Sequence, residues 1–260
     1  MKLLSLAALS LAGSAAYSQV LWDNGPMSTG TTNTVGVAAP SGNSWSELQQ
    51  VGSAFNTSVT FGVNYTFAGS TGPNRLSDDF TITGNPWQIS QIKVFATQTN
   101  MATTASFLTG VVQIWSGRPG DIGSTVVAGD LTTNRLSSTV FTGIWRVGRQ
   151  GSTLNRPIMA ATLDLPITLG PGTYWIEYGL TGSGAGSVQS PLVTVPGALT
   201  VAGANARFFT SNQYHNLVDG NSQVPLAVPF QVIGAPVPEP ATMAALGLGA
   251  LALVRRRRKG

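Results

Sequence analysis

The sequence predicts an all-β protein whose main domain is an antiparallel sandwich of two sheets. Glycine (31 residues) and proline (15 residues) are frequent, whereas only 9% of the 260 residues are charged. Long surface helices would need more glutamate and lysine, because oppositely charged pairs stabilise them. Short stretches of alternating apolar and polar residues recur between turn signals, which is the pattern of half-buried strands. The length fits one large β domain.

Seven strands are expected after residue 79, where the alternation becomes regular. They span residues 80–83, 87–95, 110–115, 138–147, 160–165, 172–180 and 228–233. Glycine and proline between several of these segments indicate turns, because proline fixes φ and glycine accepts positive φ. Residues 22–72 are rich in Gly, Ser, Thr and Asn and predict irregular arms with short strands. Strands at these intervals, with no helix between them, favour two packed sheets.

Residues 1–18 have the features of a secretory signal peptide. Lys2 precedes an apolar run over residues 3–13, and Ala16 and Ser18 occupy the −3 and −1 positions before a cleavage site. The run is apolar on all sides, unlike a buried amphipathic helix, and is too short to cross a bilayer comfortably. We therefore expect export and a mature chain that begins near Gln19.

The C-terminal segment, residues 235–260, has three parts. The first is an extended peptide with the residues Val237, Pro238, Glu239 and Pro240. Its prolines cannot enter a helix interior, so the peptide stays accessible. The apolar residues 241–254 follow and predict a single membrane helix of roughly 21 Å, somewhat short of the roughly 30 Å hydrocarbon core. The basic end stops translocation and stays cytoplasmic; it consists of Arg255, Arg256, Arg257, Arg258 and Lys259.

This order of motif, apolar helix and basic end resembles the PEP-CTERM sorting signal. The resemblance covers about the last 24 residues. It implies that the general secretion machinery exports the chain, that the inner membrane holds it transiently, and that an exosortase removes the tail. It also implies a Gram-negative envelope, a final place at the cell surface or in the extracellular matrix, and association with exopolysaccharide. A permanent tail anchor is the alternative, and the short apolar run supports it less well.

The domain between the two ends, residues 19–234, has a weaker resemblance. It is similar to a jelly-roll-like module that recurs in secreted bacterial proteins of undefined activity. The residues that carry this similarity are four short runs: Asp78-Asp79-Phe80, Ile114-Trp115-Ser116-Gly117, Arg156-Pro157-Ile158-Met159 and Gly172-Thr173-Tyr174-Trp175. The similarity implies a fold and leaves the function open.

The distribution of charge argues against nucleic acid as a partner. The formal net charge is +4, but six of the fourteen basic residues are Lys2 and the residues of the basic end. Without them and Glu239, eight basic and nine acidic residues remain, so the domain carries a charge near −1. A nucleic-acid binder needs a basic face. The absence of cysteine excludes disulfides, thiolate metal sites and a cysteine nucleophile.

No catalytic, cofactor-binding or metal-binding residue can be assigned from the sequence. His215 is the only histidine, which excludes multi-histidine metal sites, and it lies in a polar segment that suggests a surface loop. No Gly-x-Ser-x-Gly motif is present. Calcium stays open, although no Asp-x-Asn-x-Asp run is found. A glycosidase would need two paired carboxylates, and the available acids are Asp78, Asp79, Asp121, Asp130, Asp164 and Glu177.

The tryptophans leave a sugar-binding role open, because exposed aromatic faces stack on sugars. Apolar strand patterns place three of them in the core: Trp87, Trp115 and Trp175. The other three are less constrained and are the first candidates for a ligand patch: Trp22, Trp45 and Trp145. We therefore expect a non-catalytic structural or adhesive protein. A carbohydrate-binding module is the first alternative, and a polysaccharide hydrolase or lyase is the second.

Overall fold

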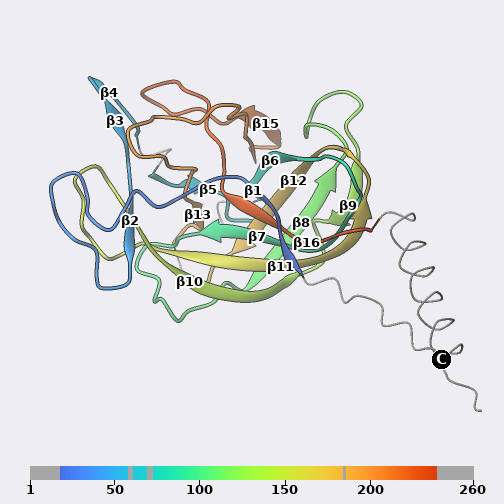
Figure 1. The fold of residues 1–260 in the computed structure, drawn as a ribbon, viewed down its shortest axis with the longest axis horizontal. Helices are drawn as coiled ribbons and strands as arrows, with labels where there is room; N and C mark the ends of the chain where they lie inside the picture. The colour runs from blue at the N-terminus through green and yellow to red at the C-terminus, as the bar shows by residue number, and fades with distance from the viewer. Residues whose placement is uncertain (1–17, 58–60, 69–72, 184–185, 239–260) are drawn as a thin grey trace, which may run out of the picture.

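The computed structural model describes residues 18–57, 61–68, 73–183 and 186–238, and the regular elements of this part are all strands (Figure 1). The first large sheet has the strand order β1 (Gln19–Asp23), β16 (Phe230–Pro236), β7 (Trp87–Ala96), β11 (Pro157–Leu169), β10 (Leu136–Val147) and β2 (Ser44–Glu47). The second has the order β15 (Gln213–Asn216), β14 (Arg207–Thr210), β6 (Arg75–Ile82), β12 (Gly172–Thr181), β8 (Thr109–Trp115) and β9 (Val126–Asp130). Two small sheets pair β13 (Gln189–Ser190) with β5 (Val63–Asn64), and β3 (Gln50–Val51) with β4 (Ala54–Phe55).

The two large sheets share one apolar core, as the alternating pattern predicts. In β12, Ile176 and Tyr178 point into this core, and Ile92 and Val94 of β7 meet them from the first sheet. Phe80 of β6 joins the sheets directly, because its ring lies 6.3 Å from that of Trp87 and 6.4 Å from that of Phe230, centroid to centroid. The prediction of an all-β protein with two packed sheets is thus confirmed.

An antiparallel ribbon of four strands connects the sheets. β6 pairs with β12 in the second sheet, and β7 pairs with β11 in the first. Because β7 follows β6 and β12 follows β11 along the chain, the ribbon passes from one sheet to the other.

The prediction of purely antiparallel sheets is wrong at one edge. β2 pairs in parallel with β10, with Trp45 opposite Trp145. A hairpin forces antiparallel pairing, but these two strands are far apart in the sequence, so no turn fixes their relative direction. The first sheet is therefore mixed.

The hairpin formed by β14 and β15 corrects another expectation. His215 lies in β15 opposite Phe208, and not in a loop. The turn residues Ser211 and Asn212 have φ angles of 50° and 60°, which is the backbone of a type I′ turn. Asn-Gly and Asp-Gly are the usual sequences for this turn, so Ser-Asn between two four-residue strands gives little signal.

Within the described residues, no helix has the length and apolar character needed to span a bilayer. The predicted membrane helix at residues 241–254, and the signal peptide up to residue 17, lie outside the described residues.

Candidate functional site

The last strand of the sandwich leads directly into the predicted sorting motif. Pro236 ends β16 opposite Trp87, and the backbone amide of Val237 donates a hydrogen bond to the carbonyl oxygen of Pro86 (2.8 Å). Pro238 is exposed. The strand thus extends two residues beyond the predicted end of the domain at position 234. The rest of the motif (Glu239 and Pro240) and the basic end (Arg255, Arg256, Arg257, Arg258 and Lys259) lie outside the described residues.

The predicted mature N-terminus lies beside this exit point. Gln19 pairs with Gly234, because β1 runs antiparallel to β16 at the edge of the first sheet (Figure 1). Ser18 is exposed, and its hydroxyl lies 3.3 Å from that of Ser90. Ala16, the other predicted cleavage-site residue, is outside the described residues. Signal peptide and tail would therefore both leave the domain from one end of the same edge.

A buried network of polar side chains surrounds Glu177 of β12. Its carboxylate is fully buried, on the face of the second sheet that points away from the core. Oε1 accepts hydrogen bonds from Arg75 Nε (2.6 Å) and the Tyr214 hydroxyl (2.8 Å). Oε2 accepts from Gln113 Nε2 (2.7 Å) and Trp115 Nε1 (2.9 Å). We call these five residues the Glu177 cluster. With four donors engaged, the carboxylate has little capacity left to act as a general base.

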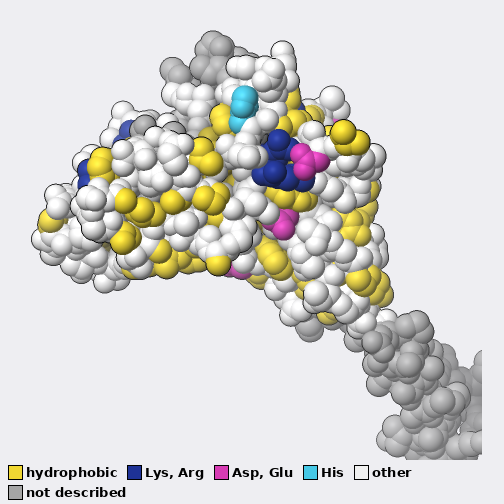
Figure 2. Space-filling view, turned by 90° about the horizontal axis from the view of Figure 1, so that it is seen from above, with side chains coloured by type: hydrophobic (Ala, Val, Ile, Leu, Met, Phe, Trp, Pro, Cys, Tyr) yellow, Lys and Arg dark blue, Asp and Glu magenta, His cyan; other side chains and the backbone are white. Residues whose placement is uncertain are grey.

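Charged side chains lie next to this cluster, and Figure 2 shows them as a compact group of both signs on one face of the domain. Arg207 pairs with Asp121 (2.7 Å). Arg118 donates to the side chain of Asn216 (2.9 Å) and its guanidinium lies 5.4 Å from the ring centroid of Trp175. Burial and the positive charge of Arg207 lower the pKa of Arg118. The opposite charges offset one another, so this face is not a basic patch.

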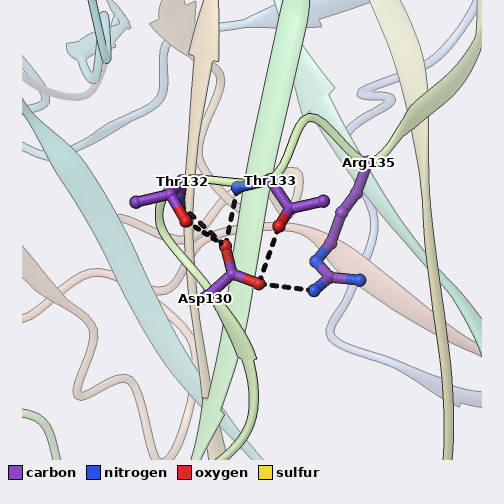
Figure 3. A network of polar contacts seen from close by, with 4 residues as sticks. All are labelled: Asp130, Thr132, Thr133 and Arg135. Carbon is purple, nitrogen blue, oxygen red and sulfur yellow. Dashed lines mark hydrogen bonds and ion pairs between the residues drawn. The ribbon is translucent and has the colours of Figure 1, made fainter.

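Asp130 caps the turn between β9 and β10 (Figure 3). Its carboxylate accepts hydrogen bonds from the backbone amides and hydroxyls of Thr132 and Thr133, and pairs with Arg135 (2.7 Å). These contacts, led by the Thr132 hydroxyl, lower the pKa of Asp130 well below its usual range. This is the turn-capping role typical of aspartate in a polar loop.

The candidate acids Asp78, Asp79 and Asp164 lie on three different faces of the two large sheets. Asp164 lies on the outer face of the first sheet, where it accepts hydrogen bonds from Gln91 (2.8 Å) and Ser137 (3.0 Å). Asp78 and Asp79 are neighbours on β6, so their side chains point to opposite faces of the sheet. The described residues contain no group of three or more His, Asp or Glu side chains that could hold a metal ion.

The burial of the tryptophans differs in part from the prediction. Trp45, expected among the candidates for a ligand patch, is only 2% exposed and donates from Nε1 to the carbonyl oxygen of Val37 (3.0 Å). Trp22 and Trp145 are half-buried, and Trp22 packs against the core. Of the predicted core tryptophans, Trp175 is buried, whereas two are only half-buried: Trp87 and Trp115.

Asp78 is a carboxyl group in an unusual place, because its side chain points toward the core and is almost fully buried. It accepts hydrogen bonds from Asn24 Nδ2 (2.7 Å) and from the backbone amide of Val228 (2.9 Å). These two residues lie just after β1 and just before β16, so Asp78 links β6 to the edge of the first sheet. Burial raises the pKa of Asp78 to about 7, and the amides of Val228 and Asp79 oppose this rise.

The raised pKa of Asp78 makes stability depend on pH. The folded domain holds this proton more tightly than the unfolded chain, whose pKa is near 3.8. Stability is therefore expected to fall as pH rises from about 4 to about 7, by up to about 4 kcal/mol relative to an Asp78→Asn variant. Urea unfolding of both proteins at several pH values in this range measures the difference. The amide of the Asp78→Asn variant does not titrate, so it changes the free energy of unfolding by the same amount at every pH. If the free energies of unfolding of the two proteins changed in parallel with pH, the expectation would be contradicted.

Comparison with known protein families matches residues 236–259 to the PEP-CTERM protein-sorting motif. The match begins at Pro236, the last residue of β16, and extends through the basic end. This confirms the predicted sorting signal and implies export and processing by an exosortase. Neither the comparison with curated proteins nor that with solved structures found a match.

Proposed function

We propose that the sandwich is an extracellular structural or adhesive domain that acts without catalysis at the cell surface or in the matrix. The observation that carries this proposal is the position of the sorting motif. The motif begins where β16 ends, and Gln19 pairs with Gly234 at the same place. Attachment at this one end leaves the rest of the domain accessible to partners.

The use of the acidic side chains supports a non-catalytic role. Glu177, Asp130 and Asp164 each accept hydrogen bonds that connect strands or cap turns. The ring of His215 lies against Phe208, with 5.5 Å between the ring centroids. A glycosidase needs two carboxyl groups on either side of one sugar bond, whereas the carboxylates of Glu177, Asp130 and Asp164 are engaged in these structural contacts.

The sorting motif also supports a more detailed pathway. The general secretion machinery would export the chain, the inner membrane of a Gram-negative envelope would hold it by residues 241–254, and an exosortase would release it. Exopolysaccharide is the partner that we propose in the matrix, and the near-neutral domain argues against nucleic acid.

Cells that make the full chain should attach to an exopolysaccharide-coated surface better than cells that make a chain ending at Pro238, because only the full chain carries the address for display. Attachment and protease accessibility of the domain are measured on the same cells. A parallel incubation of the purified protein with the polysaccharide should yield no new reducing ends or unsaturated sugars. Equal attachment of both strains would contradict the adhesive role, and polysaccharide turnover would contradict the absence of catalysis.

A further inference from the structure

A groove of about 500 Å³ lies between the small β13–β5 sheet and the β14–β15 hairpin. Its volume is in the range of small-ligand sites. None of its described lining residues is charged, and three of them could contact a ligand: Asn64, Gln189 and Phe208. It lies apart from the Glu177 cluster, none of whose residues line it.

Two amide side chains stand side by side in this groove. Asn64 of β5 and Gln189 of β13 are opposite each other in the strand pair, so they share one face. Asn64 Oδ1 accepts hydrogen bonds from the amide (3.0 Å) and hydroxyl (2.7 Å) of Thr66, which orients the Asn64 amide group and leaves its Nδ2 as a donor.

The Gln189 side chain lacks a partner at its oxygen. Oε1 is buried and accepts no hydrogen bond from the described residues. A glycine at position 62 makes room for this side chain, because a Cβ on Gly62 would lie 2.9 Å from Gln189 Cβ and 3.2 Å from Oε1. A buried acceptor without a donor is unfavourable, so a ligand hydroxyl that donates to Oε1 would stabilise the groove.

An aromatic ring completes the groove. Phe208 is half-buried and packs against the core, and β14 is held between β6 and β15. Aromatic faces contact the apolar C–H faces of sugars, while planar amides bond to their hydroxyl groups. The amide donor of Asn64, the unpartnered acceptor of Gln189 and the ring of Phe208 together match the chemistry of a carbohydrate.

We propose that this groove binds a short segment of an uncharged polysaccharide. Asn64 Nδ2 donates to one sugar hydroxyl, Gln189 Oε1 accepts from another, and Phe208 packs against the apolar face of the ring. The absence of a charged lining residue among those described favours a neutral sugar over a uronic acid or a sulfated one. This site goes beyond the adhesive role proposed above, which does not depend on the surface that makes the contact.

The full chain, purified in detergent, is tested on an array of neutral gluco-, galacto-, manno- and xylo-oligosaccharides and of oligosaccharides of uronic acids. Binding constants for the positive sugars are then measured by calorimetry. We expect saturable binding to at least one neutral oligosaccharide, weakened ten-fold or more by Asn64→Ala and by Gln189→Ala. Phe208→Leu keeps the apolar contact with the core but removes the flat ring, and should weaken binding similarly.

Two further variants make the result decisive. Gln189→Met keeps the length of the side chain but removes the acceptor oxygen, so it should weaken binding as Gln189→Ala does without leaving a cavity. Gln88→Ala removes a matched amide from a different groove, beside Ser18 on the first sheet, and should bind as the unchanged chain does. The proposal is overturned by binding to uronic-acid oligosaccharides alone, by no binding to any neutral sugar, or by groove variants that bind as well as Gln88→Ala. Because these assays do not measure cell attachment, none of the three outcomes decides the adhesive role, which has its own test.

Discussion

Replacement of Glu177 by alanine is expected to lower the free energy of unfolding of the domain by about 3–5 kcal/mol, the range seen when one partner of a buried ion pair is removed. The carboxylate accepts from Arg75, Gln113, Trp115 and Tyr214, so its loss leaves four donors without an acceptor, one of them charged. Urea unfolding of residues 19–238 measures this change.

Two variants show whether the effect belongs to the Glu177 cluster. Glu177→Gln keeps the volume but places an amide group against two donors, so it should fall between the wild type and the alanine variant. Asp164→Ala removes an exposed carboxylate that also accepts from two side chains, and should change stability by less than about 1 kcal/mol. A loss for Glu177→Ala no larger than for Asp164→Ala would contradict the structural importance of the cluster.

Burial and the negative charge of Glu177 raise the pKa of Tyr214 to about 12. The tyrosine therefore stays a hydrogen-bond donor at physiological pH, which is consistent with the expected cost of removing its acceptor.

Replacement of Pro238, Glu239 and Pro240 by alanine is expected to abolish removal of the tail while leaving the melting temperature of the domain unchanged. Pro238 is exposed beyond the end of β16, and the last described backbone hydrogen bond of this segment is donated by Val237. The three residues belong to the matched sorting motif. Immunoblots of membrane and surface fractions measure processing, and thermal unfolding measures stability.

A second change separates recognition of the motif from retention of the chain at the inner membrane. Replacement of Arg255–Arg258 by serine removes most of the charge that resists translocation, so the chain should leave the inner membrane more readily. A control replaces Arg149, an exposed arginine outside the matched sorting motif, and should be sorted normally. For the alanine variant of Pro238, Glu239 and Pro240, normal removal of the tail would contradict the prediction that these residues are needed for processing.

The sequence located the central strands well where alternation and turn residues agree. The ranges 87–95 and 172–180 differ by one residue from β7 and β12. The range 160–165 was too short, because β11 continues through Pro166 to Leu169. The pairing register shifts between Asp164 and Ile167, and such a bulge accommodates a proline that would otherwise end a strand.

The candidate sites could not be predicted from patterns in short stretches of the sequence. The Glu177 cluster draws its donors from three strands, at position 75 of β6, positions 113 and 115 of β8 and position 214 of β15, and spacing along the chain does not pair them. Trp45 shows the same limit. A long loop folds back so that Val37 accepts its indole hydrogen, which no short-range signal reports. In contrast, the sorting signal is contiguous, and its residues could be identified directly.

The most direct test of the account is intact-mass and peptide mass spectrometry of the form recovered from the cell surface or matrix. We expect an N-terminus near Gln19 and a C-terminus at or near the Pro238-Glu239-Pro240 motif, with the apolar segment and the basic end absent. A surface form that still carries the intact segment through Lys259 would contradict it, because the tail would then be a permanent anchor and not a removable sorting signal.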